Sequence, residues 1–175
     1  MNQNNIYMMG FMGTGKTKVG KLIAELIEWQ FIDTDACIVE DAGMSIPKIF
    51  ETYGEPHFRE LEKKWIKHTS KGQHQVISLG GGAVVDEENW EVIHSNGITV
   101  NLSYPPSIIY ERLARKTDRP LLANDDKEAR LSRIISLLDK RKPVYDKADI
   151  IFHLNHEQPA EQVAKSIVAL LGVHS

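Results

Sequence analysis

Several features are scarce or missing in this 175-residue sequence, and each absence narrows the possible functions. Cys37 is the only cysteine, which rules out an internal disulfide and argues against a cysteine-built metal site. No apolar run approaches the roughly 20 residues of a membrane span. The polar start, MNQNN, lacks the basic and apolar segments of a signal peptide. These absences predict a cytoplasmic protein with no membrane partner.

A large charge of one sign is also missing. The 21 Lys and Arg residues nearly balance the 24 Asp and Glu residues, and the formal net charge of -3 argues against nucleic acid as a partner. Hydrophobic residues make up 42% of the chain, which is enough for an ordinary core. We therefore expect a single domain over residues 1–175, and we expect it to be a monomer.

Short apolar segments alternate along the chain with longer segments of helical periodicity. The expected strands cover residues 6–9, 31–33, 75–79, 98–102 and 149–154. The expected helices cover residues 19–27, 45–53, 55–70, 86–95, 105–115, 127–142 and 159–171. Residues 117–126 are polar, contain a proline and are expected to form a loop. The alternation predicts an α/β fold of three layers, with a parallel sheet covered by helices on both faces.

The glycine-rich segment GFMGTGKT, residues 10–17, matches the phosphate-binding pattern G-x-x-x-x-G-K-[ST] at every fixed position. It also stands between an expected strand and an expected helix, which is the context that this pattern requires. Glycines allow consecutive backbone N–H groups to point at a phosphate, and the helix adds its positive end. Lys16 supplies a positive charge to the outer phosphates, and the Thr17 hydroxyl can hold Mg²⁺.

Other classes of phosphate-loop protein fit the sequence less well. A GTPase needs a D-x-x-G motif, which this chain lacks, and DKAD at residues 146–149 is only a near miss to the base-reading motif. The chain is short for a motor or a transporter ATPase. A small-molecule kinase remains, with a nucleotide-binding regulator without turnover as an alternative from another class.

Two polar or glycine-rich positions follow the expected strands. Asp33 and Asp35 come at the end of the second strand, where open α/β sheets place their ligands. In a strand, residues two apart point the same way, although Asp35 could instead cap the following helix. Gly80–Gly82 follow the third strand and indicate either a ligand close to the backbone or a flexible turn.

An ordered set of short segments resembles the shikimate kinase family. After the phosphate loop come FIDTD at residues 31–35, FRELE at 58–62, SLGGGA at 78–83, RPLL at 119–122, and Lys140-Arg141 with Pro143 and Tyr145. The resemblance runs over about residues 6–159. It implies a five-stranded parallel sheet in the order 2-3-1-4-5 and transfer of the ATP γ-phosphoryl group to the 3-hydroxyl of shikimate, with Mg²⁺. Another small-molecule kinase, such as a gluconate kinase, is the alternative within the same class.

The resemblance also implies a role for each candidate residue. It implies a substrate-binding flap over about residues 35–61 and a lid over about 115–126. The implied nucleotide-binding residues are Gly13, Thr14, Gly15, Lys16, Thr17, Lys18, Arg112, Arg119 and Glu157. The implied magnesium ligands are Thr17 and Asp33. The implied shikimate-binding residues are Asp35, Arg59, Gly80, Gly81, Gly82 and Arg141. Catalytic roles fall to Lys16, Asp35 and Arg119.

One implied segment departs from the family's pattern. The adenine loop of the family often carries basic residues, whereas residues 155–159 here read NHEQP. Glu157 therefore places an acid where the family often has a base.

Overall fold

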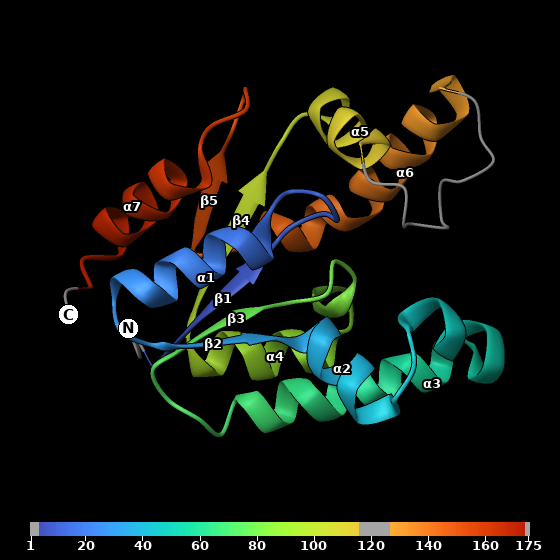
Figure 1. Cartoon of the computed structure of the whole chain (residues 1–175), viewed down its shortest axis with the longest axis horizontal. Coiled ribbons are helices and arrows are strands. Elements are labelled where there is room, and N and C mark those ends of the chain that lie inside the picture. Colours follow the sequence, from blue (N-terminus) through green and yellow to red (C-terminus); the bar gives the residue numbers. More distant parts are fainter. Residues whose placement is uncertain (1–3, 116–126, 174–175) are drawn as a thin grey trace.

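The computed structural model describes residues 4–115 and 127–173, and it contains one parallel sheet of five strands (Figure 1). The strands are β1 (Asn5–Met9), β2 (Gln30–Asp33), β3 (Gln75–Ser78), β4 (Ile98–Ser103) and β5 (Ile150–His153). Their order across the sheet is β2-β3-β1-β4-β5, and every neighbouring pair is parallel. The predicted fold class and strand order are confirmed.

Helices cover both faces of this sheet. They are α1 (Lys16–Leu26), α2 (Thr34–Ala42), α3 (Ile46–Thr69), α4 (Glu87–Asn96), α5 (Pro106–Ala114), α6 (Lys127–Tyr145) and α7 (Ala160–Leu171), with a 3₁₀ turn, η1, at Ala83–Val85. Helices α1 and α7 pack together on one face, while α3 and α4 pack together on the other (Figure 1). None of the described helices is both long and apolar enough to cross a membrane.

The central strand β1 shows why the sheet is parallel and covered on both sides. All five of its residues are buried, so neither of its faces is solvated. Helix α1 follows it and buries Val19, Ile23 and Ala24, which recur at helical spacing. The main core forms between these elements and extends to Val163 and Ile167 of α7.

The sequence analysis missed helix α2, and it wrongly placed two acidic side chains together on a strand. Strand β2 ends at Asp33, whose Oδ1 atom accepts a hydrogen bond from the N–H of Ala36, 3.2 Å away. Asp33 is therefore the residue that caps the next helix, and Asp35 lies in the first turn of α2. The two carboxylates come from different elements, so the expectation that both extend from one strand is wrong, although both line the same cavity.

The two helices expected over residues 45–53 and 55–70 form α3, which is interrupted at Gly54. Gly54 has φ 82° and ψ 168°, a conformation open essentially to glycine alone. The kink lets Ile49 and Phe58, on its two sides, pack with Ile38 of α2 in a second small core. Helices α2 and α3 are thus a partly independent unit beside the sheet.

Candidate active site

The phosphate loop leaves β1 and turns tightly into α1. Gly10 has φ +135°, and a Cβ atom there would lie 2.7 Å from the carbonyl oxygen of Leu102, so a larger residue does not fit. The buried Lys16 ammonium donates hydrogen bonds to the carbonyl oxygens of Gly10, at 2.8 Å, and Phe11, at 3.0 Å. The predicted phosphate-binding lysine is therefore held within the loop, with its positive charge beside the backbone that would surround a phosphate.

Thr17 and Asp33 meet beside the loop with oxygen atoms suited to a hard cation. Thr17 Oγ1 donates a hydrogen bond to Asp33 Oδ2 at 2.7 Å and lies 3.4 Å from Ser78 Oγ. Mg²⁺ favours such oxygen ligands and takes only one or two of them from a protein, keeping waters and phosphates for the rest. The residues present therefore fit the ion that the sequence implied.

A cavity of about 420 Å³ opens in front of the loop. It is lined by residues of the phosphate loop and by residues that follow β2 and β3, among them Lys16, Thr17, Asp33, Asp35, Ser78 and Gly81. Phosphate-binding groups and candidate acceptor-binding groups therefore share one space, as a direct transfer between two bound substrates requires.

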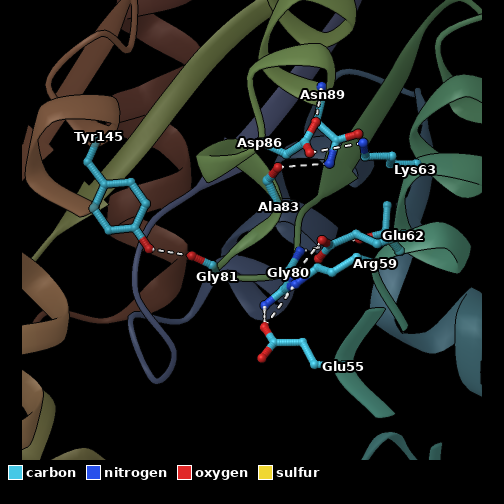
Figure 2. A network of polar contacts seen from close by, with 11 residues as sticks. Glu55, Arg59, Glu62, Lys63, Gly80, Gly81, Ala83, Asp86, Asn89 and Tyr145 are labelled. Atoms are coloured by element: carbon cyan, nitrogen blue, oxygen red, sulfur yellow. Dashed lines mark hydrogen bonds and ion pairs between the residues drawn. The ribbon is translucent and has the colours of Figure 1, made fainter. Parts of the chain in front are cut away.

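Arg59, from the second part of α3, is held by two acids of the same helix (Figure 2). Its Nη2 atom donates to Glu55 Oε1 at 2.8 Å, and its Nη1 atom donates to Glu62 Oε2 at 2.9 Å. Burial alone lowers the pKa of Arg59, but the hydrogen bond to Glu55 and the charge of Glu62 outweigh it and raise that pKa. The guanidinium is therefore permanently charged and fixed in direction, as a carboxylate-binding group should be.

The sequence analysis missed Glu62, which is the buried partner of Arg59. Its side chain is only 1% exposed. Burial raises the pKa of Glu62, and the nearby Arg59 charge opposes this, while Asp35 adds to it. The three-residue spacing from Arg59 places both side chains on one face of a helix, but this spacing does not distinguish a buried acid from an exposed one.

The glycine loop after β3 lies where these side chains converge. A Cβ atom on Gly80 would lie 2.8 Å from both Asp35 Oδ1 and Glu62 Oε1, and one on Gly82 would lie 3.0 Å from Arg59 Nη1. A Cβ atom on Gly81 would lie 3.3 Å from Arg141 Nη1, on the far side of the loop. The structure thus brings Asp35, Arg59 and Arg141 together around Gly80–Gly82, where any added side chain would have to displace these charged groups.

Arg141 comes from α6 and faces the same loop. Its guanidinium carbon lies 5.4 Å from the centre of the Phe11 ring. Its Nη1 atom is buried and makes no hydrogen bond with any residue in the described part of the chain. A buried N–H group of this kind has high affinity for an anionic acceptor, because leaving it unsatisfied is costly.

A second cavity, of about 690 Å³, lies on the other side of the phosphate loop. Arg112 forms its wall: the guanidinium stacks 4.1 Å from the centre of the Tyr104 ring, and Nη1 donates to the carbonyl oxygen of Thr14 at 3.2 Å. Glu157 lies 3.4 Å from Arg112 Nε and 3.3 Å from Arg115 Nη1. The predicted Arg112 and Glu157 therefore meet in one cluster. The sequence analysis did not single out Arg115 as a member of this cluster.

The remaining predicted nucleotide residues divide into two groups. Gly13, Gly15 and Lys18 line the second cavity. Arg119 and most of the predicted lid lie outside the described residues, so their roles remain predictions from the sequence.

Comparison with known proteins gives the family. A model of the shikimate kinase family matches residues 12–172. A shikimate kinase from Caldicellulosiruptor bescii is 44% identical over 166 residues, which is 95% of this chain and 94% of that protein. The structure of shikimate kinase from Acinetobacter baumannii in complex with shikimate superimposes with a TM-score of 0.88 at 34% identity, covering 97% of this chain and 93% of that one.

Two further structures bear on the two small-molecule kinase alternatives. Shikimate kinase from Bacteroides thetaiotaomicron superimposes with a TM-score of 0.90 at 33% identity, covering 97% of this chain and 98% of that one. A gluconokinase from Sinorhizobium meliloti 1021 reaches a TM-score of only 0.58 at 18% identity, with 98% of this chain and 93% of that one covered, which is a likeness of fold alone. The comparisons support shikimate kinase over gluconate kinase, and the chain belongs to the shikimate kinase family.

Proposed function

We propose that this enzyme transfers the γ-phosphoryl group of ATP to the 3-hydroxyl of shikimate by the action of the residues described above. One observation carries the proposal: Asp35, Arg59 and Arg141 converge on the Gly80–Gly82 loop, beside a cavity shared with Lys16. The relative from Acinetobacter baumannii, described in complex with shikimate, supports the choice of acceptor. A cytoplasmic location and a monomeric state stay predictions from the sequence.

On the nucleotide side, the backbone of residues 13–18 and Lys16 bind the phosphates of ATP. Lys16, now bonded to two loop carbonyls, turns its ammonium toward the β- and γ-phosphates when ATP enters. Arg112 and Glu157 bind at the adenine end, next to Tyr104. Thr17 and Asp33 would hold Mg²⁺, which would supply positive charge to the phosphates.

On the acceptor side, two arginines bind the carboxylate of shikimate. Arg59 and Arg141 approach the glycine loop from α3 and α6, and both present N–H groups suited to a planar anion. The Gly81 backbone lies between them and contributes a further contact. Asp35 accepts a hydrogen bond from the hydroxyl and holds it in line with the γ-phosphorus, either orienting the group or taking its proton.

Phosphoryl transfer itself needs little covalent participation by the protein, because its transition state is loose. The protein contributes alignment of the two substrates and neutralisation of charge on the transferring group. We propose that Arg119 reaches the phosphates from the lid over about residues 115–126, and that the flap over about residues 35–61 closes on shikimate. Closure would exclude water and so limit hydrolysis of ATP.

The test is ADP formation by the purified protein with shikimate, with gluconate and with no acceptor. We expect ADP to form rapidly only with shikimate, and we expect shikimate 3-phosphate to be identified by mass spectrometry. Asp35→Asn should reduce shikimate-dependent turnover by roughly 10²–10⁴, while slow hydrolysis of ATP persists because Lys16, Thr17 and Asp33 are intact. Rapid turnover with gluconate, or normal turnover of shikimate by Asp35→Asn, would contradict these assignments.

A further inference from the structure

Tyr145, the last residue of α6, connects this helix to two segments that are far apart in the sequence, the glycine loop of the acceptor site and strand β4. Its side chain is buried, and its hydroxyl donates a hydrogen bond of 2.7 Å to the carbonyl oxygen of Gly81 (Figure 2). Its own carbonyl oxygen accepts a hydrogen bond of 3.2 Å from Asn101 Nδ2, in β4. The end of α6 is therefore fixed to the sheet on one side and to the glycine loop on the other.

The same end of α6 carries Arg141. Residues four apart in a helix lie on one face, one turn from each other, so the Arg141 and Tyr145 side chains leave α6 in the same direction. Both reach Gly81: Tyr145 through its hydroxyl, and Arg141 through Nη1, which lies 3.3 Å from the position of a Gly81 Cβ atom. The position of the loop relative to the guanidinium therefore depends on where the tyrosine hydroxyl holds it.

Pro143 lies between these two residues in α6. It makes the end of this helix more dependent on the hydrogen bonds that Tyr145 forms with Asn101 and Gly81. Proline has no N–H group, so it removes one backbone hydrogen bond from the last turn of the helix. The turn that carries Arg141 and Tyr145 is therefore less firmly held by its own backbone. The bonds from Asn101 and to Gly81 supply the fixation that the helix lacks.

The bond also orients the peptide group that joins Gly81 to Gly82. The described chain contains no cis peptide bonds, so the N–H of Gly82 points opposite to the carbonyl of Gly81. Because Tyr145 holds that carbonyl toward α6, the N–H is directed away from α6. Figure 2 shows Arg59 on this other side of the loop, and a Cβ atom on Gly82 would lie 3.0 Å from Arg59 Nη1.

We propose that Tyr145 is a positioning residue for the acceptor: its hydroxyl fixes the Gly81–Gly82 peptide so that the loop, Arg59 and Arg141 form a preformed carboxylate site. The inference rests on the proposed function. Burial raises the pKa of Tyr145, against a smaller opposing effect of Arg141, so the hydroxyl keeps its proton and stays a donor at neutral pH. An ordered site binds more tightly because less ordering is left to occur on binding.

The variant Tyr145→Phe tests this, because it removes the hydroxyl and keeps the ring that packs in the core. We expect the KM for shikimate to rise about ten-fold, as for a lost hydrogen bond to a buried carbonyl. We expect kcat to fall by less and the KM for ATP to stay within about two-fold of the wild-type value. Binding of an ATP analogue confirms that the variant is folded.

The matched control is Tyr104→Phe, which removes a buried tyrosine hydroxyl on the nucleotide side. Its oxygen accepts a hydrogen bond of 3.0 Å from Arg112 Nη2. We expect the opposite result for this variant: a higher KM for ATP and an unchanged KM for shikimate. Equal increases in both KM values for Tyr145→Phe would mean that Tyr145 only packs the core, and the inference would be wrong.

A double-mutant cycle with Arg141→Ala tests the route of the effect. If Tyr145 acts by placing the loop against Arg141, then Tyr145→Phe should weaken shikimate binding less than about two-fold in the Arg141→Ala background. Full additivity would overturn the inference. A wild-type protein without shikimate-dependent turnover would overturn the proposed function as well, whereas an active wild type with an unchanged Tyr145→Phe variant would overturn only the role of Tyr145.

Discussion

Glu62 is a buried acid in the site proposed for the carboxylate of shikimate, and its pairing with Arg59 explains why an acid can lie there. Its buried carboxylate accepts a hydrogen bond of 2.9 Å from Arg59 Nη1. The charge of Arg59 is thus partly balanced before a substrate arrives. A buried charged pair of this kind contributes little to stability on balance, because desolvation offsets attraction. Its value here is the fixed direction of the guanidinium.

The raised pKa of Glu62 should make the free energy of unfolding depend on pH. Burial raises the pKa of Glu62 above that of an unfolded chain, and Arg59 opposes the rise without cancelling it. A group with a raised folded pKa adds stability that is fully present below its unfolded pKa and is lost as the pH rises through the folded value. The free energy of unfolding of the wild type, relative to Glu62→Gln, should therefore decline as the pH is raised from about 4 toward neutrality.

Urea denaturation of both proteins at several pH values measures this difference. The matched control is Glu60→Gln, which changes an exposed acid on the same helix and should alter the free energy of unfolding by less than about 0.5 kcal/mol. A difference that grows as the pH rises would mean that pairing with Arg59 outweighs burial, contrary to the assignment.

Individual residues differ in how far their roles can be predicted from the sequence. Lys16 and Thr17 could be predicted because the phosphate loop is a local motif, and its geometry depends on glycines a few residues away. Glu62 could not be, because an acid on an amphipathic helix normally faces solvent, and only the approach of Gly80 and Arg59 makes it buried. Tyr145 belongs to the set of residues that carries the family resemblance. Its hydrogen bond to Gly81 could not be predicted, because the two residues are 64 positions apart in the sequence.

Among the helices, α3 depends most on a single residue. Its two parts bury Ile49 and Phe58 against α2 because Gly54 breaks the helix between them, and the rings of Phe50 and Phe58 lie 4.9 Å apart across the break. The second part carries Arg59. The direction of Arg59 therefore depends on the conformation at Gly54.

We expect Gly54→Ala to lower the free energy of unfolding by about 1–3 kcal/mol, because alanine is strained at φ 82° and ψ 168°. It should also raise the KM for shikimate, since the two parts of α3 can no longer keep their angle. Chemical denaturation and steady-state kinetics measure the two effects. The control is Gly43→Ala, at φ 62° and ψ 18° in open space, which should cost only about 1 kcal/mol and raise the KM for shikimate by less than Gly54→Ala does. Equal effects of the two changes would show that the kink does not position Arg59.

The elements themselves were predicted well where the apolar pattern was strong and poorly where it was weak. The buried strand β1 and the helix α1 have patterns that their burial explains. Helix α2 has only nine residues and buries only Thr34 and Ile38, so its periodicity is too short to detect. Its start was hidden further because Asp33 and Asp35 read as the end of a strand, whereas the hydrogen bond from Ala36 makes Asp33 the cap.

Across the entire fold, the strand order separates the two substrates. With β1 in the centre, the phosphate loop lies in the middle, and β3 and β2 carry the acceptor site to one side together with α2 and α3 (Figure 1). On the other side β4 and β5 lead into α5 and the start of α7, which form the second cavity. The two sites meet at the phosphate loop and where α6, which carries Arg141, packs against α5, which carries Arg112. Changes on one side should therefore alter the binding of one substrate far more than that of the other.

Arg112 and Arg59 allow a matched test of this separation, because each is an arginine on one side of the loop. Arg112 bonds the carbonyl of Thr14, stacks on Tyr104 and pairs with Glu157, and these contacts need the planar fork of a guanidinium. Arg112→Lys keeps the charge and loses the fork. It should raise the KM for ATP roughly ten-fold, as for the loss of hydrogen bonds made by a charged group, with little change in the KM for shikimate.

Arg59→Lys should give the reverse result, a higher KM for shikimate with an almost unchanged KM for ATP, because lysine cannot bond Glu55 and Glu62 at the same time with the same geometry. Steady-state kinetics with each substrate varied in turn measures both variants. If each change raised both KM values alike, the two sites would be coupled through the phosphate loop. The loop would then be a mobile element that responds to both substrates. If instead each variant raised only one KM value, the loop would keep its shape while either side is disturbed. The hydrogen bond of 2.8 Å from Thr14 Oγ1 to the carbonyl oxygen of Phe11, within the loop, leads us to expect this result.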